Sequence, residues 1–224
     1  MKLSSNKLII RDLGLQDYEP IWKSMQDFTA NRDNSTPDEL WCLEHPPVFT
    51  MGLNGKKIHL LNIQNIPVID IDRGGQVTYH GPGQLVIYTL IDLKRLNIGV
   101  KDLVKIIEQS IIELLQQYGI DAKGKENAPG VYVNNAKIAA LGLRIKRNKS
   151  YHGLSLNLDM DLTPFKQINP CGYEGLAVTQ ISDLKPEQAL ENLKTDLIAH
   201  LSKLLGYSEK SIVYTTQDYK IKNI

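Results

Sequence analysis

The 224-residue sequence predicts an α/β (α+β) fold, in which a mixed sheet is flanked by helices. Two observations support this: strand-like segments outnumber helical ones, and each long helix separates two groups of strands. The strands and helices do not alternate regularly, which argues against a doubly wound or barrel fold. We expect one domain over residues 1–224, with a frayed tail over residues 217–224.

Three segments have apolar residues at the spacing of an amphipathic helix. They cover residues 17–29, 100–118 and 186–205. Gly119 and Gly206 follow the second and third segments, at the position where helices commonly end. The sequence therefore predicts two long helices and one of medium length.

Short runs rich in β-branched and aromatic residues predict the strands. The run at residues 84–93 is continuously apolar, which is typical of a strand buried on both faces. The turn residues Asn134 and Asn135 predict a hairpin. In chain order, the expected strands are residues 8–13, 39–44, 68–72, 84–93, 131–133, 136–145, 154–158 and 211–216.

The composition is that of an ordinary globular protein, with 42% hydrophobic and 23% charged residues. A net charge of +1 indicates no strong field for nucleic acid or a membrane surface. Two cysteines in a chain of this length do not form a disulfide framework, so we expect a reducing, cytoplasmic setting. We recognise no secretory signal and no apolar run long enough to span a bilayer.

Cys171 is the first candidate for chemistry. It lies between Pro170 and Gly172, which predicts a thiol on a turn rather than inside a helix or strand. Cys42, in contrast, belongs to an apolar run and is expected in a buried strand. A thiol is an effective nucleophile when a nearby cation stabilises its thiolate, and Lys137 is the candidate cation. The alternative is that Cys171 is an inert small hydrophobe.

Lys137 opens a strand of small, apolar residues. An amine in such surroundings loses hydration, which predicts a lowered pKa for Lys137. The alternative is a lysine at a hairpin end with its amine in water, and this segment alone favours that alternative.

A glycine-rich segment covers residues 73–84. If it is extended, Gln76, Thr78 and His80 share one polar face; the alternative is a hairpin with a surface histidine. No Gly-Lys-Ser/Thr and no helix start follow, which excludes a P-loop. Cys42 and His45 have a metal-like spacing, but no second ligand pair follows, so we expect no metal site.

Taken together, these segments resemble the lipoyl(octanoyl) transferase family. The matching stretches are residues 44–50, 73–84, 137–144, 152–158 and 169–172. The resemblance implies the fold of the catalytic domains of biotin protein ligases and lipoate ligases. It implies transfer of an octanoyl group from octanoyl-acyl carrier protein to a lysine of a lipoyl domain. The implied acceptors are lipoyl domains of 2-oxoacid dehydrogenase complexes and the glycine cleavage H protein.

The resemblance also implies the residues of the site. Cys171 would be the acyl-thioester nucleophile, and Lys137 the partner that stabilises its thiolate. Apart from the resemblance, the chemistry needs donors for the developing oxyanion, and the candidates are backbone N–H groups at Gly172 or in the Gly142 strand. Because the donor arrives activated, no ATP or other cofactor is expected. The residues expected to line the acyl site are Arg73, Gly74, Gly75, Gln76, Val77, Thr78, Tyr79, His80, Ala140, Leu141, Gly142, Gly153, Leu154 and Ser155.

Several alternatives stay open. The chain would be an ATP-dependent lipoate or biotin ligase if it activated a free acid. It would be a non-catalytic acyl or lipoyl-domain binding module if the fold were kept without chemistry. The roles of His80 and His152, chemical or only shaping the site, are also open. A basic run either docks acidic partner proteins or is a solvated hairpin tip: Arg144, Lys146, Arg147 and Lys149.

Overall fold

The computed structural model describes residues 7–186 and 191–215. Its main sheet has the strand order β11-β1-β2-β6-β10-β9-β8-β7. β11 and β2 run parallel to β1, whereas the remaining neighbours are antiparallel. The sheet is therefore mixed, as predicted. The strands are β1 (Leu8–Leu15), β2 (Asp38–Glu44), β6 (Gln84–Leu90), β7 (Lys123–Gly124), β8 (Gly130–Val133), β9 (Ala136–Lys146), β10 (Lys149–Asn157) and β11 (Ile212–Thr215).

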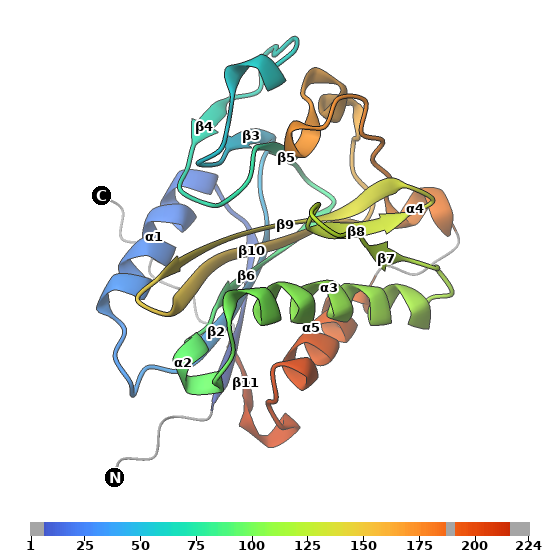
Figure 1. Cartoon of the computed structure of the whole chain (residues 1–224). Helices are drawn as coiled ribbons and strands as arrows, with labels where there is room; N and C mark the ends of the chain where they lie inside the picture. Colours follow the sequence, from blue (N-terminus) through green and yellow to red (C-terminus); the bar gives the residue numbers. More distant parts are fainter. Residues whose placement is uncertain (1–6, 187–190, 216–224) are drawn as a thin grey trace.

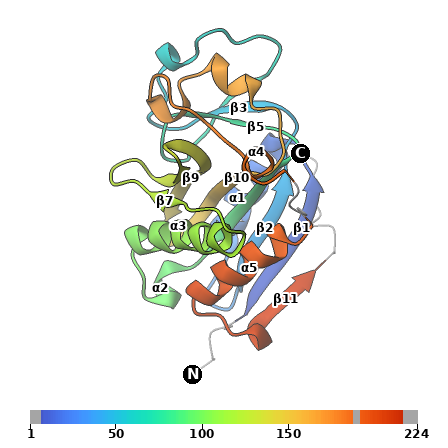
Figure 2. The ribbon, with the colours of Figure 1, turned by 90° about the vertical axis from the view of Figure 1, so that its right-hand side faces the viewer.

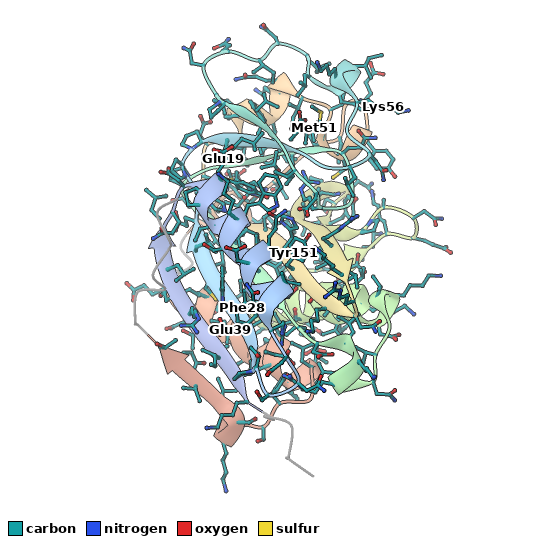
Figure 3. The ribbon with its side chains drawn as sticks, turned by 90° about the vertical axis from the view of Figure 1, so that its left-hand side faces the viewer. Glu19, Phe28, Glu39, Met51, Lys56 and Tyr151 are labelled. Carbon is teal, nitrogen blue, oxygen red and sulfur yellow. The ribbon has the colours of Figure 1, made fainter. Side chains whose placement is uncertain are left out.

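Helices cover both faces of this sheet (Figures 1 and 2). α3 (Val100–Gln117) and α5 (Leu193–Leu204) pack on one face, where the leucine and isoleucine stripe of α3 is fully buried in the largest core cluster. α1 (Tyr18–Asn31) packs on the opposite face, which Figure 3 shows together with Tyr151 on the neighbouring strand β10. Helices thus flank a mixed sheet, and the predicted fold class is confirmed.

A smaller sheet lies above one end of the main sheet in Figure 1. It has the order β4-β3-β5, with β3 parallel to β4 and antiparallel to β5. β5 contacts the 3-10 helix η3 (Pro170–Gly172), which carries the candidate thiol. The small sheet therefore brings the glycine-rich segment to Cys171. Its strands are β3 (Val48–Met51), β4 (Val68–Asp70) and β5 (Val77–His80).

The remaining short helices connect these elements. α2 (Leu93–Leu96) follows β6, and α4 (Ile181–Leu184) follows the segment that carries the candidate thiol. The other 3-10 helices are η1 (Lys57–His59), η2 (Thr163–Gln167) and η4 (Glu209–Ser211).

The predicted hairpin between β8 and β9 is confirmed. Asn134 and Asn135 both have positive φ, at +47° and +70°, as a two-residue hairpin turn requires. A second turn of the same kind joins β9 to β10, where Arg147 and Asn148 have φ of +51° and +60°. β9 and β10 are therefore continuous antiparallel neighbours.

Some element boundaries differ from the prediction. The strand expected over residues 84–93 ends at Leu90, because Asp92 caps α2 by accepting the Arg95 N–H at 3.1 Å. The strand expected to begin at residue 154 begins at Lys149. β3 and β7 were not among the expected strands, and β5 shows that part of the glycine-rich segment is extended.

The last predicted helix also begins late. α5 starts at Leu193, and Pro186 lies in a turn. Residues 187–190, in the middle of that predicted helix, and the predicted tail over residues 217–224 lie outside the described residues.

Candidate active site

Cys171 lies on a tight turn at the edge of a cavity. Its backbone has φ +56° and ψ 16°, and Gly172 follows with φ +80°. The turn is closed by two hydrogen bonds, from Gly172 N–H to Asn169 O (2.9 Å) and from Tyr173 N–H to Pro170 O (3.1 Å). The left-handed region is unfavourable for a non-glycine residue, so the surrounding turn holds the thiol in a defined position.

Lys137 brings an amine to this thiol from β9. Its Nζ donates to Cys171 Sγ at 2.9 Å, although the two residues are 34 positions apart. The same Nζ donates to Pro129 O (3.2 Å) and lies 5.1 Å from the centre of the Tyr132 ring. Lys137 is only 4% exposed. The interpretation favoured by the segment alone, an amine in water, is wrong.

The backbone of Lys137 is also bonded to the chain segment beyond Cys171. Lys137 N–H donates to Ala177 O (2.8 Å), and Thr179 N–H donates to Lys137 O (3.0 Å). These bonds form an isolated parallel bridge between Lys137 and Val178. The segment that follows the thiol is thereby fastened to the residue that carries the amine.

The charge state of Lys137 differs from the prediction. Burial removes hydration and by itself would lower the pKa of Lys137. The negative charge of a Cys171 thiolate and the hydrogen bond to it, supported by Tyr132, outweigh burial and raise the pKa above its ordinary value of 10.5. The predicted lowering of the Lys137 pKa is wrong, because the apolar neighbours are visible in the local sequence and the Cys171 sulfur is not. Lys137 is therefore protonated at neutral pH.

A cavity of about 450 Å³ opens beside Cys171 and Lys137. This volume lies within the range of roughly 300–1,000 Å³ that is usual for small-ligand sites. All of the predicted acyl-site residues except Tyr79 line it. Tyr79 points to the opposite face of β5, with its ring centre 5.4 Å from those of Phe49 and Phe165. Strand alternation separates Tyr79 from Thr78 and His80, which face the cavity.

The cavity wall includes residues that the sequence did not single out. Val86 and Tyr88 lie two apart on β6, and this period-two spacing is a signal that was available. The run was interpreted as a strand buried on both faces, so no side was assigned to the cavity. The additional lining residues are Tyr18, Asn54, Val86, Tyr88, Val100, Val104, Asn127, Ala128, Pro129, Leu143 and Tyr173, and His152, whose role the sequence left open, lines the cavity as well.

Arg73 places a guanidinium in the cavity wall. Its Nη2 donates to Thr50 O (2.7 Å) and Thr50 Oγ1 (3.0 Å), and its Nη1 donates to Gly74 O (2.9 Å). Burial lowers the pKa of Arg73, and no ion pair joins it to a carboxylate within the described part of the chain. A side chain at Gly142 would place its Cβ 2.8 Å from Arg73 Cδ, so this glycine makes room for the arginine.

Asp72 anchors the start of the glycine-rich segment. Its carboxylate accepts hydrogen bonds from Trp22 Nε1 (2.7 Å) and Gln26 Nε2 (3.1 Å) on α1, and from Tyr151 OH and His152 Nε2 (3.0 Å) on β10. Burial would raise the pKa of Asp72, but these four donors hold it below its ordinary value. Asp72 therefore fastens the loop before the cavity to two elements of the main fold.

The histidines near the cavity are neutral. Burial lowers the pKa of His80 to about 3 and that of His45 to about 4. Burial also lowers the pKa of His152, despite its contact with Asp72. His80 Nδ1 hydrogen-bonds to Gln84 Oε1 at 2.7 Å. These hydrogen bonds favour a role in shaping the wall over proton transfer.

Two expectations about polar groups are revised. The Gly172 N–H donates to Asn169 O, so this expected oxyanion donor already has a backbone partner. In the basic run, Lys149 Nζ donates to Arg32 O (2.5 Å), whereas Arg144, Lys146 and Arg147 are exposed. Only three of its four cations therefore face solvent.

Cys42 is remote from this chemistry. It is fully buried in the main core on β2, and burial raises its pKa to about 12.

Among residues 7–186 and 191–215, no three His, Cys, Asp or Glu side chains form a group that could hold a metal ion. No helix in those ranges is long and apolar enough to cross a membrane.

Known proteins share this fold. A putative lipoate protein ligase from Thermoplasma acidophilum superposes with a TM-score of 0.74 at 13% identity, covering 94% of this chain and 88% of that one. The biotin protein ligase from Aquifex aeolicus superposes with a TM-score of 0.53 at 12% identity, covering 89% of this chain and 68% of that one. The fold class is therefore that of lipoate and biotin protein ligases.

Sequence comparison is more specific. Residues 17–202 match the family model of the lipoyl protein ligase A/B catalytic domain. The octanoyltransferase of Shewanella loihica is 58% identical over 92% of this chain and 95% of its own length. The octanoyltransferase of Laribacter hongkongensis is 60% identical over 88% of this chain and 95% of its own length. The chain belongs to the octanoyltransferase family, and it is an acyltransferase.

Proposed function

We propose that this enzyme moves an octanoyl group from octanoyl-acyl carrier protein to the lysine amine of a lipoyl domain, through a thioester on Cys171. The observation that carries the proposal is the 2.9 Å contact between Lys137 Nζ and Cys171 Sγ at the edge of the cavity. The pair supplies a nucleophile and a proton carrier in one place. The cavity supplies space for the acyl chain.

In the first step, the Cys171 thiolate attacks the carbonyl carbon of the donor thioester. The bond from that carbon to the carrier sulfur breaks, and the departing thiolate takes a proton from the Lys137 ammonium. The products are octanoyl-Cys171, a neutral Lys137 amine and the free carrier thiol. The raised pKa of Lys137 supports this order, because the amine is protonated before the reaction begins.

In the second step, the acceptor lysine enters as a neutral amine and attacks octanoyl-Cys171. The carbon–sulfur bond breaks, the acceptor nitrogen loses a proton to the Lys137 amine, and an amide forms. The thiolate and the ammonium are both regenerated, so protons balance over the cycle. Arg73, which lacks a carboxylate partner within the described residues, adds positive charge to the wall while the oxyanion is present.

The test is the intact mass of the enzyme after incubation with octanoyl-acyl carrier protein alone. We expect an increase of one octanoyl group, lost in Cys171→Ala and retained in Cys42→Ala, the matched control for the buried thiol. Subsequent addition of a lipoyl domain should discharge the adduct and raise the mass of the lipoyl domain by the same amount. If the mass of the enzyme does not increase under these conditions, the covalent route is contradicted.

The ATP-dependent ligase of the same fold is the second candidate. It would convert free octanoate and ATP to an acyl adenylate without using a thiol. The fastened Cys171–Lys137 pair favours the thioester route, and so do the octanoyltransferase relatives. Formation of octanoyl-AMP by the Cys171→Ala variant would support the ligase. A non-catalytic binding module is disfavoured, because binding alone requires neither member of the pair.

A further inference from the structure

The floor of the cavity changes height across three neighbouring strands. β9, β10 and β6 are adjacent in the main sheet, and their register sets cavity-lining residues opposite one another. In each row β9 and β10 contribute small residues, whereas β6 contributes a larger one. The two rows are Ala140–Ser155–Val86 and Gly142–Gly153–Tyr88. The floor is therefore low over β9 and β10 and rises at β6.

The reactive sulfur lies at the low end of this floor. Cys171, Ala140 and Ser155 line the large cavity and also a small adjoining cavity of about 10 Å³. Lys137, whose amine contacts the sulfur, belongs to β9. One direction inside the large cavity leads from Cys171 across the strands to Val86 and Tyr88 on β6.

The wall at β6 is held rigidly. Tyr88 OH hydrogen-bonds to His45 Nε2 (2.7 Å), and His45 Nδ1 donates to Gln16 O (2.6 Å). Tyr18 from α1 hydrogen-bonds to Tyr88, and its ring centre lies 4.8 Å from that of His45. Val86 beside them is 1% exposed. The side chains of this wall are packed, so they cannot move aside when an acyl chain contacts them.

We propose that Val86 and Tyr88 are the specificity-determining residues that set the length of the acyl chain; the inference rests on the thioester at Cys171 proposed above. Neighbouring strands are about 4.8 Å apart, so β9 to β6 spans about 10 Å. An extended eight-carbon chain has seven bonds of about 1.5 Å in a zigzag and spans about 9 Å. A ten-carbon chain spans about 11 Å by the same estimate, and its end collides with the wall.

The experiment offers equal amounts of octanoyl- and decanoyl-acyl carrier protein and measures the ratio of the two adducts on the enzyme by intact mass. The enzyme without substitutions should carry more octanoyl adduct than decanoyl adduct. Val86→Ala removes two methyl groups from the wall and should raise the decanoyl-to-octanoyl ratio at least about 10-fold, the usual discrimination for one to two methylenes. Val86→Leu extends the wall and should shift the preference between hexanoyl and octanoyl toward hexanoyl.

Val133→Ala is the matched control, since Val133 is a buried valine of β8 that does not line the cavity. Its ratio should equal that of the unmodified enzyme. Because a ratio is measured within each variant, partial loss of stability does not change the conclusion. Unchanged ratios in both Val86 variants, with adducts present, overturn the inference. Absence of any adduct on the unmodified enzyme overturns the proposed function, and the inference with it.

Discussion

Replacing Lys137 with methionine removes the ammonium and keeps an unbranched side chain of similar length. We expect the octanoylation rate of Cys171 to fall, because the variant neither stabilises the thiolate nor protonates the departing carrier thiolate. Lys137 is almost fully buried, so no other described cation takes its place beside the sulfur. The backbone bonds from Lys137 to Ala177 and Thr179 remain, since the substitution does not alter them.

The magnitude follows from the geometry. At the observed separation of 2.9 Å, two unit charges in an effective dielectric of about 20 attract by about 6 kcal/mol. Desolvation offsets part of this attraction, and breaking one side of a buried pair typically costs about 3–5 kcal/mol. General acid–base catalysis by one side chain contributes about 10²–10⁴-fold. Both estimates predict a loss of about 10²–10⁴-fold in the acylation rate.

The assay is single-turnover acylation, quenched and measured by intact mass across a range of pH. The raised pKa of Lys137 means that the ammonium is lost only as pH rises above about 10.5, so the enzyme without substitutions keeps this proton donor through neutral pH. The rate deficit of Lys137→Met should therefore be constant through neutral pH and shrink only above about pH 10.5, where the enzyme without substitutions also loses the ammonium.

Lys125→Met is the control, since the Lys125 amine lies 4.3 Å from the centre of the same Tyr132 ring. It should retain the full rate and the pH profile of the enzyme without substitutions. A Lys137→Met rate within 10-fold of the unmodified enzyme at pH 7 would refute the reasoning.

Three further predictions concern stability and docking. Asp72→Asn should lower the free energy of unfolding by about 2 kcal/mol through lost hydrogen bonds to a charged acceptor. Because the pKa of Asp72 is depressed, the gap in melting temperature should be constant above pH 3.8 and shrink as pH falls below it; a gap that widens in acid would contradict this. Gly153→Ala should lower the free energy of unfolding by more than about 2 kcal/mol, because its Cβ would lie 2.1 Å from Ile87 O. Gly124→Ala, whose Cβ would lie 3.5 Å from its nearest atom, should leave that free energy nearly unchanged; chemical denaturation measures both. Lys146→Glu should raise the KM for octanoyl-acyl carrier protein at low salt and leave kcat unchanged; an unaltered KM would indicate that the exposed hairpin tip does not dock the carrier.

Sequence patterns were most informative where the physics is local. Asn134 and Asn135 predicted their turn because the left-handed conformation is a property of one or two residues. The turn at Cys171 was predictable for the same reason, from its Pro and Gly neighbours. The helix ending before Gly119 also follows from local backbone freedom.

Features that depend on contacts between residues far apart in the sequence were harder to predict than the turns. The pKa of Lys137 depends on a sulfur 34 residues away, so a local argument gave the wrong sign. Alternation along β5 separates Tyr79 from Thr78 and His80, and Tyr79 packs against Phe49. The resemblance nevertheless implied every residue of the motif as part of the acyl site, Tyr79 included. Val86 and Tyr88 were missed, since their role requires the register of β6 with β10.

The bridge between Lys137 and the segment at residues 177–179 has a mechanical consequence. Backbone hydrogen bonds join Lys137 to residues 177 and 179, so the strand that carries the amine and the segment that follows the thiol move as one unit when the surrounding loops fluctuate. Motions of the loops at the cavity mouth can therefore change access to the cavity while this backbone connection stays intact.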